Sequence, residues 1–418
     1  MSKLDEMIRE LCPDGVEYKR FDEVCTLNAR IGWQRLTKAE YMSKGDYLLI
    51  TGTDFTETHE IDYSTCVYVT EERYKQDSKI QLKNGDILIT KDGTLGKVAQ
   101  VKGLEMPATL NGGVFVVRCK DGSLENRFIL HYLLSNHFQS VVEQQKTGST
   151  ISHLTQTLFS RLMIPIPPLE IQREIVRILD NFTELTAELT AELTARKTQY
   201  SFYRSRLLTF DANVEWKTVD EIAEVTDYVA NGSFAALKEN VNYKHTPDYA
   251  ILVRTTDLVN GFDEENLVYI DKHAYNYLSK SKLYGGEIII NNIGAGVGTT
   301  FLCPCLDTYM SLAPNSIMVK TNNNKFYYYW LNSKEGQNAI RKIVSQGSLP
   351  KFNKTGFRSI RLPVPPLDVQ NRIVNVLDNF EKICSDLNIG LPAEIEARQK
   401  QYEYYRDKLL TFKEVAAT

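Results

Sequence analysis

The sequence lacks the features of a membrane or metal-bound protein. It has no apolar run of about 18 residues, the length that a membrane-spanning helix needs. Its first residues, MSKLDEMIRELCPDG, do not contain the apolar core of a signal peptide. The seven cysteines fit neither a disulfide framework nor a zinc site, and the one close pair, Cys303 and Cys305, has no nearby histidines. These absences predict a cytoplasmic protein that binds no metal and no membrane.

Motifs for catalysis are also missing. The sequence has no Gly-x-x-x-x-Gly-Lys-Ser/Thr phosphate loop, no Asn-Pro-Pro-Tyr/Phe methyltransferase motif and no Pro-Asp…Glu-x-Lys nuclease set. The segment EIIINNIGAGVG does place Gly294, Gly296 and Gly298 after an expected strand. This pattern faintly resembles the glycine turn of a nucleotide-type cofactor site, but a glycine-rich hairpin loop explains it equally. Its counterpart, TKDGTLG at 90–96, lacks the pattern.

Charge is unevenly distributed along the chain, although the net charge is only −4. Two stretches, 144–169 and 336–367, contain no acidic residue, and the second carries six Lys and Arg residues. Such a basic stretch suits contact with phosphates, yet a solvated face that only aids solubility would have the same composition.

The chain contains an internal repeat. The segment PIPPLEIQREIVRILDNF at 165–182 returns as PVPPLDVQNRIVNVLDNF at 363–380, with an offset of 198 residues. Likewise ARKTQYSFYRSRLLTF at 195–210 returns as ARQKQYEYYRDKLLTF at 397–412, with an offset of 202. The regions before these blocks match only faintly. The layout is therefore a variable region followed by a constant region, twice, and two divergent modules within one frame suit two readers of different targets.

The constant regions have the apolar period of a coiled coil, and each begins with Pro-Pro at an expected helix start. The seam of the first is predicted to consist of Ile171, Ile175, Ile178, Phe182, Leu185, Leu189, Leu193, Tyr200, Tyr203 and Leu207. The seam of the second is predicted to consist of Val369, Ile373, Val376, Phe380, Ile383, Leu387, Tyr402, Tyr405 and Leu409. A break is expected in the second at Gly390-Leu391-Pro392. The tandem Thr-Ala-Glu-Leu units at 186–193 predict a helix of adjustable length.

These patterns predict an α/β (α+β) fold with a pseudo-two-fold internal repeat. Two globular domains, 1–163 and 211–361, should be separated by two long antiparallel coiled-coil helices, 164–210 and 362–412, and followed by a short tail, 413–418. Small polar residues beside Lys and Arg in the acid-free stretches and near the glycine turns suit contacts with phosphates and base edges. The candidate DNA-binding residues are Lys91, Lys146, Ser149, Thr150, Arg254, Asn291, Asn292, Lys351, Asn353, Lys354 and Arg358.

The chain resembles the specificity subunit of type I restriction–modification systems. The resemblance rests on the two Pro-Pro-Leu-x-x-Gln…Leu-Asp-Asn-Phe blocks, the two Gln-Tyr…Tyr-Arg…Leu-Leu-Thr-Phe blocks and the Thr-Ala-Glu-Leu units, which are similar to those of the type IC branch. It implies that each variable region is a target recognition domain for one half of a bipartite site in double-stranded DNA. The constant helices would dock two methyltransferase subunits, and two restriction/motor subunits would complete the assembly. S-adenosyl-methionine, ATP and Mg²⁺ would be bound by those partners, with no cofactor on this chain and no catalytic residue.

Two other hypotheses remain open from the sequence. One is a self-contained DNA-modifying enzyme that uses the turn from Gly294 to Gly298 for a nucleotide-type cofactor. The other is a coiled-coil spacer protein that does not bind DNA. Binding of a cofactor by the isolated chain would favour the former, and a gel shift that depends on salt concentration would exclude the latter.

Overall fold

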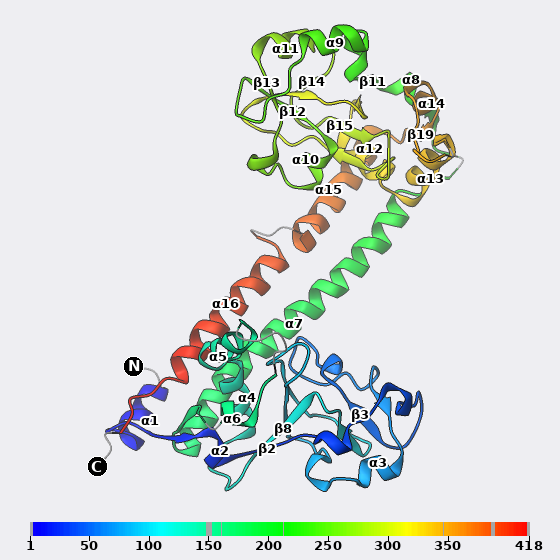
Figure 1. Cartoon of the computed structure of the whole chain (residues 1–418). Coiled ribbons are helices and arrows are strands. Elements are labelled where there is room, and N and C mark those ends of the chain that lie inside the picture. Colours follow the sequence, from blue (N-terminus) through cyan, green and yellow to red (C-terminus); the bar gives the residue numbers. More distant parts are fainter. Residues whose placement is uncertain are drawn as a thin grey trace. The chain divides into compact units, whose positions relative to one another are not determined.

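The computed structural model describes residues 3–147, 153–159, 161–211, 213–345, 347–385 and 389–415. The chain forms two compact units (Figure 1), of which unit 1 comprises Met1–Glu192 with Leu391–Thr418, and unit 2 comprises Leu193–Gly390. The end of the chain joins unit 1 because the backbone N–H of Val415 donates to the carbonyl of Val16, at 3.1 Å. Among the described residues, no helix has the length and apolar character needed to cross a membrane.

Unit 1 combines short strands with six helices outside the constant regions in its described part. The strands are β1 Glu17–Arg20, β2 Cys25–Asn28, β3 Leu48–Ile50, β4 Val67–Tyr68, β5 Ile87–Thr90, β6 Val98–Gln100, β7 Ala108–Leu110, β8 Val114–Cys119 and β9 Met163–Ile166. The helices are α1 Lys3–Leu11, α2 Phe21–Val24, α3 Glu71–Lys75, α4 Asn126–Leu134, α5 Asn136–Thr147 and α6 Gln156–Phe159.

Unit 2 repeats this arrangement. Its strands are β10 Trp216–Thr218, β11 Glu224–Asp227, β12 Ala250–Val253, β13 Tyr269–Ile270, β14 Lys282–Leu283, β15 Ile288–Asn291, β16 Thr300–Leu302, β17 Tyr309–Leu312, β18 Ser316–Lys320 and β19 Arg361–Pro363. Its helices outside the constant regions are α8 Val219–Ile222, α9 Phe234–Asn240, α10 Thr255–Val259, α11 Lys272–Tyr277, α12 Asn324–Leu331, α13 Lys334–Ile343 and α14 Lys354–Arg358.

Sheet topology confirms that the two variable regions share one fold. Unit 1 has a four-stranded antiparallel sheet in the order β2-β8-β5-β6, and unit 2 has the matching order β11-β18-β15-β16. Beside it lies a mixed sheet in which β3 pairs in parallel with β7, as β12 does with β17. A two-stranded ribbon, β1-β9 or β10-β19, leads into each constant helix. The mixed α/β class predicted from the sequence is therefore correct.

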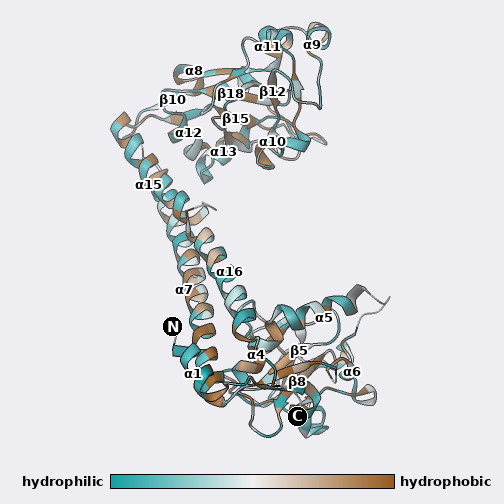
Figure 2. Cartoon of the chain, turned by 90° about the vertical axis from the view of Figure 1, so that its left-hand side faces the viewer, coloured by the Kyte–Doolittle hydropathy of each residue, from teal (hydrophilic) through white to brown (hydrophobic). Residues whose placement is uncertain are grey.

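The cores form where sheets meet helices. In unit 1, apolar side chains of β5 and β8 pack against α4, and the ribbons of these strands are coloured hydrophobic in Figure 2. The equivalent core of unit 2 contains Phe326, Tyr327, Tyr329 and Trp330, all of them buried on α12. Burial of such aromatic side chains contributes much of the stability of a domain, and each unit therefore has the core of an independent domain.

The constant regions are helical, as predicted. The first is one continuous helix, α7, which spans Leu169–Leu207, whereas the second is divided into α15, Leu367–Ser385, and α16, Leu391–Leu409. The predicted break before Pro392 is thus confirmed. A glutamine in each Pro-Pro-Leu-x-x-Gln motif fixes the helix start, because Nε2 of Gln172 donates to the carbonyl of Pro167 at 2.8 Å, and Nε2 of Gln370 to that of Pro365 at 2.9 Å.

Helix α7 lies beside α16 within unit 1 and beside α15 within unit 2 (Figures 1 and 2). The contacts are reciprocal between the repeats. Phe182 stacks on Tyr405 with ring centroids 5.5 Å apart, and the equivalent pair, Phe380 and Tyr203, stacks at 5.7 Å. Rising residue numbers on α7 meet falling numbers on the partner helices, so the pairing is antiparallel. The pseudo-two-fold repeat is therefore present in the contacts as well as in the sequence.

The apolar seam is shared between the coiled coil and the domain cores. Ile171 and Ile175 are fully buried in the core of unit 1 together with Leu179, a position outside the predicted seam. Phe182, Leu185 and Leu189 are half-buried, while Val376 and Ile383 are each 40% exposed. Leu387 lies outside the described residues. The first turns of each constant helix thus serve mainly as part of a domain, and the coiled-coil pattern alone does not reveal this second role.

Candidate nucleic-acid interface

A glycine turn follows the central strand of each four-stranded sheet. In unit 2, the N–H of Asn291 donates to Thr299 at 3.0 Å and the N–H of Gly298 donates back to Asn291 at 2.8 Å. In unit 1, Thr90 makes the same two bonds with Lys97 and Gly96, both at 2.9 Å. The residue before the turn therefore differs, threonine in one unit and asparagine in the other, while the backbone is the same.

The turn in unit 2 is a hairpin loop and not a cofactor site. Strand β15 pairs antiparallel with β16 directly after it, from Ile288 opposite Leu302 to Ile290 opposite Thr300. A nucleotide-type glycine turn leads instead into a helix whose N-terminus binds phosphate. The described residues also contain no group of three or more His, Cys, Asp or Glu side chains that could hold a metal. The hairpin alternative considered for Gly294–Gly298 is the correct one.

In unit 2 the acid-free stretch packs against this turn. The N–H of Gly294 donates to Pro350 at 2.8 Å, and the N–H of Phe352 donates to Asn292 at 3.1 Å. Ile293 and Lys351 form an isolated β-bridge. Segments some 60 residues apart in sequence thus form one surface, and it brings together the candidates Asn291, Asn292, Lys351 and Asn353.

The equivalent surface exists in unit 1. The carbonyl of Lys91 accepts the N–H of Leu154 at 3.0 Å, which joins the turn to the end of the first acid-free stretch. The ammonium of Lys91 lies 5.2 Å from the ring centroid of Phe115. Lys146 lies on α5, and Ser149 and Thr150 fall outside the described residues.

Several candidate cations are engaged within the chain. Nζ of Lys354 lies 2.8 Å from Asp227, and the guanidinium of Arg358 donates to the carbonyl of Val225 at 3.0 Å. Arg254 pairs with Asp257 at 2.6 Å, and this hydrogen bond raises the pKa of its guanidinium. Asn353 caps α14 by accepting the N–H of Gly356 at 2.8 Å. Positioning within the fold is therefore an established role of these four, whereas the side chain of Lys351 is exposed.

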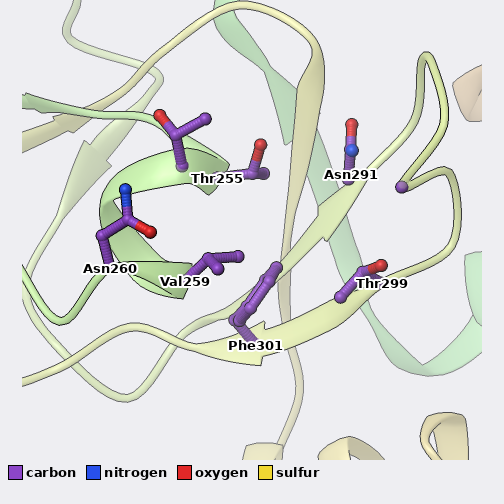
Figure 3. A pocket seen from close by; sticks show the side chains of 8 residues that line it. Thr255, Val259, Asn260, Asn291, Thr299 and Phe301 are labelled. Carbon is purple, nitrogen blue, oxygen red and sulfur yellow. The ribbon is translucent and has the colours of Figure 1, made fainter. Parts of the chain in front are cut away.

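Other exposed residues near this surface were not among the candidates. Arg341 and Lys342 are exposed at the end of α13, in the helix that precedes the basic loop. A pocket of about 210 Å³ adjoins the glycine turn on its other side (Figure 3). Its walls are Thr255, Thr256, Val259 and Asn260 from α10 and the following residue, and Asn291, Gly296, Thr299 and Phe301 from the hairpin. Since α10 lies some 30 residues earlier, no local sequence pattern indicates this pocket.

A buried polar network fixes each variable domain to its constant helix. In unit 1, Nε2 of His131 lies 2.9 Å from Asp180 of α7, which also binds Arg127, while Nδ1 of His131 lies 2.9 Å from the Tyr402 hydroxyl. The offset of 198 residues converts Arg127, His131 and Asp180 into Lys325, Tyr329 and Asp378. In unit 2, Lys325 and Tyr329 bind Asp378 at 2.6 and 2.7 Å.

The network of unit 1 is sensitive to acid. Burial opposes ionisation of Asp180, but hydrogen bonds from His131 and Arg127 outweigh it and lower its pKa to about 2. A depressed carboxyl pKa contributes stability above about pH 4 that is lost as the pH falls toward 2. Burial lowers the pKa of His131, so the unfolded chain binds a proton near pH 6.5 that the folded chain does not. Both groups therefore destabilise the folded state in acid.

Comparison with known proteins agrees with this architecture. The family model described as the type I restriction modification DNA specificity domain matches residues 13–196 and again 213–397. The specificity subunit of the type I restriction enzyme EcoR124I/EcoR124II from Escherichia coli is 31% identical over 312 residues, which are 71% of this chain and 73% of that protein.

Solved structures show the same fold. A type I restriction–modification S subunit from M. genitalium aligns with a TM-score of 0.52 at 15% identity, over 95% of this chain and 96% of that one. A chain from a structure of complex assembly and conformational transition of the type I R-M system aligns with a TM-score of 0.56 at 15% identity, over 95% and 98%. The comparisons give no support to a self-contained enzyme. The two matches of the family model together span most of the sequence, and the chain therefore belongs to the family of type I restriction–modification DNA specificity subunits.

Proposed function

We propose that this chain gives a type I restriction–modification enzyme its DNA sequence specificity, with unit 1 reading one half of a bipartite target and unit 2 the other. The observation that carries the proposal is the combination of one backbone with two chemistries at the glycine turns. Thr90 and Lys91 in unit 1 stand where Asn291 and Asn292 stand in unit 2. A shared fold that presents different side chains beside a basic loop is what two readers of different base sequences require.

The basic side chains would supply affinity that does not depend on sequence. Lys351, Arg341 and Lys342 are exposed, and contacts from such residues to phosphates release counterions from DNA. The short polar side chains at the turns would supply the discrimination between bases. This division between positioning contacts and base contacts is general in proteins that read duplex DNA.

The constant helices would dock two copies of one partner, the methyltransferase subunit. Phe202 is 58% exposed beside Tyr203, and the equivalent Tyr404 is 61% exposed beside Tyr405. Exposed aromatic pairs are typical of protein interfaces, and their repetition at an offset of 202 residues provides two equivalent docking sites. Two restriction/motor subunits would join through that core. S-adenosyl-methionine, ATP and Mg²⁺ would be bound by the partners, and this chain would supply no catalytic residue.

Modification mapping tests the proposal. The full chain is co-expressed with a type I methyltransferase subunit, and the methylated adenines of plasmid DNA are mapped. We expect methylation at a bipartite sequence with a fixed gap, and none when the purified chain is mixed with S-adenosyl-methionine alone. Methylation by the isolated chain, or methylation at a continuous site without a gap, would contradict the proposed role.

A further inference from the structure

The pocket of about 210 Å³ in unit 2 lies between α10 and the glycine hairpin (Figure 3). Figure 3 shows Thr255, Val259 and Asn260 along one side and Asn291, Thr299 and Phe301 along the other. Among the described residues that line it, none carries a charge. The pocket therefore does not suit a phosphate or a metal ion, both of which require charged or strongly polar ligands.

The polar atoms of the pocket are available to a ligand. Oδ1 of Asn291 accepts only the N–H of Ile293, at 3.3 Å, and its Nδ2 has no partner in the described part of the chain. A Cβ atom at position 296 would lie 3.0 Å from this Nδ2, so the glycine there leaves the amide uncovered. The side chain of Asn260 is exposed at the end of α10. Hydroxyl groups of Thr255 and Thr299 complete a set of neutral donors and acceptors.

The wall of the pocket also has an apolar part. Val259 is 68% exposed, although it is a large hydrophobic residue on a short helix, and Phe301 is half-buried opposite it. A surface that offers amides, hydroxyls and an apolar patch in one place matches the major-groove edge of an adenine–thymine pair. Adenine presents N6 and N7 to a side-chain amide, and thymine presents its methyl group to apolar side chains.

Unit 1 has no such opening at the equivalent place. Gly52 occupies the position of Thr255, directly after Thr51, whose N–H bonds to Asp54 as that of Arg254 bonds to Asp257. A Cβ atom on Gly52 would lie 2.6 Å from the side chain of Thr90, so the two segments are in direct contact there. Thr90 is 1% exposed and its hydroxyl is satisfied by Thr94 and Lys97. The pocket is thus a local difference between two otherwise equivalent turns.

We propose that this pocket, with Asn291 as its main reading group and Asn260 as a second, selects an adenine–thymine pair in the half-site read by unit 2. The inference rests on the proposed function and adds the identity of a base pair and of the residues that read it. The amide of Asn291 donates to N7 or accepts from N6 of adenine, and Val259 and Phe301 contact the thymine methyl.

The test uses the full chain assembled with its methyltransferase subunit and plasmid libraries in which each position of the bipartite site is randomised in turn. Asn291→Thr introduces the residue that unit 1 has at the same backbone position, so the variant is compatible with the fold. Asn260→Ala removes the second amide at an exposed position. The fraction of methylated molecules is measured for each of the four base pairs at every position, and the half-site of unit 1 is an internal control.

We expect the wild-type chain to prefer an adenine–thymine pair at one position of the second half-site, and Asn291→Thr to reduce that preference by about 5- to 150-fold. Asn260→Ala should reduce it less, and the first half-site and the gap should not change. An unchanged preference in both variants, a relaxed position that reads guanine–cytosine, or an equal loss of methylation at all sequences would each overturn the inference. A wild-type assembly without any bipartite site would instead overturn the proposed function itself.

Discussion

One additional Thr-Ala-Glu-Leu unit inserted after Leu193 should widen the gap between the two half-sites by one base pair, or at most two. Helix α7 is continuous over 39 residues, about 58 Å, and the repeat lies where unit 1 ends and unit 2 begins, at Glu192 and Leu193. Four residues lengthen a helix by about 6 Å and rotate its end by about 40°. One base pair of DNA adds about 3.4 Å and about 35°, so the rotations nearly match.

The local structure tolerates this change. The hydroxyl of Thr186 donates to the carbonyl of Phe182 at 2.8 Å, and Thr190 bonds to Thr186 at the same distance, so successive units make identical contacts. The first half of α7 pairs with α16 and the second half with α15, and an insertion between the halves leaves both pairings intact. Insertion of two residues would rotate the second half by about 200° and direct its apolar side chains away from the seam.

Mapping of methylated adenines in plasmid DNA measures the gap for each variant. Thr190→Ala, which alters the repeat without changing its length, is the matched control and should leave the gap at its wild-type value. The two-residue insertion should abolish methylation. A four-residue insertion that leaves the gap unchanged, or that alters either half-site, would refute the idea that the repeat sets the distance between the recognition domains.

Three other changes probe the basic surface, the buried network and the independence of the two units. Alanine at three exposed basic positions of unit 2 should flatten the dependence of DNA affinity on salt by about three units, near one for each phosphate that these side chains neutralise, and more than alanine at the internally paired Lys354 and Arg358; the three are Arg341, Lys342 and Lys351. Asp180→Asn should destabilise unit 1 by about 2–3 kcal/mol and weaken the acid sensitivity seen between pH 6.5 and 4 by hydrogen exchange of α4, whereas α12 should be unaffected. Replacement of 1–163 by the same region of a relative should change one half-site in modification maps and leave the other; a change in both would argue against independent readers.

The repeated frame was predictable because it rests on local patterns. Proline pairs, apolar periods and helix-forming composition act within a few turns, and the helix starts and the break before Pro392 lie where those patterns place them. The division of α15 from α16 required only the helix-breaking character of one segment. Fold class followed in the same way, from short apolar runs and one amphipathic helix late in each module.

The candidate interface was predictable only in part, because it depends on partners distant in sequence. Lys354 binds Asp227, which lies 127 residues earlier, and charge counts along the chain cannot reveal such a pairing. Conversely, the turn at Asn292 and the basic loop at Lys351 were predicted separately, and hydrogen bonds between their backbones join them. The pocket walls on α10 were missed because small polar residues on a short helix have no distinctive pattern.

The distribution of differences between the units indicates how specificity can change without loss of assembly. Positions that mount a domain on its helix remain equivalent in function, since an aspartate of α7 or α15 binds a cation and a ring from the domain in both units. The reciprocal stacks of Phe182 and Phe380 are likewise shared. At the glycine turns the backbone bonds are kept while the side chains differ, and the replacement of Gly52 by Thr255 accompanies the opening of a pocket. Because the turn is surrounded by backbone hydrogen bonds that any side chain permits, substitutions there alter recognition at small cost in stability, and the constant helices and their partners need not change with them.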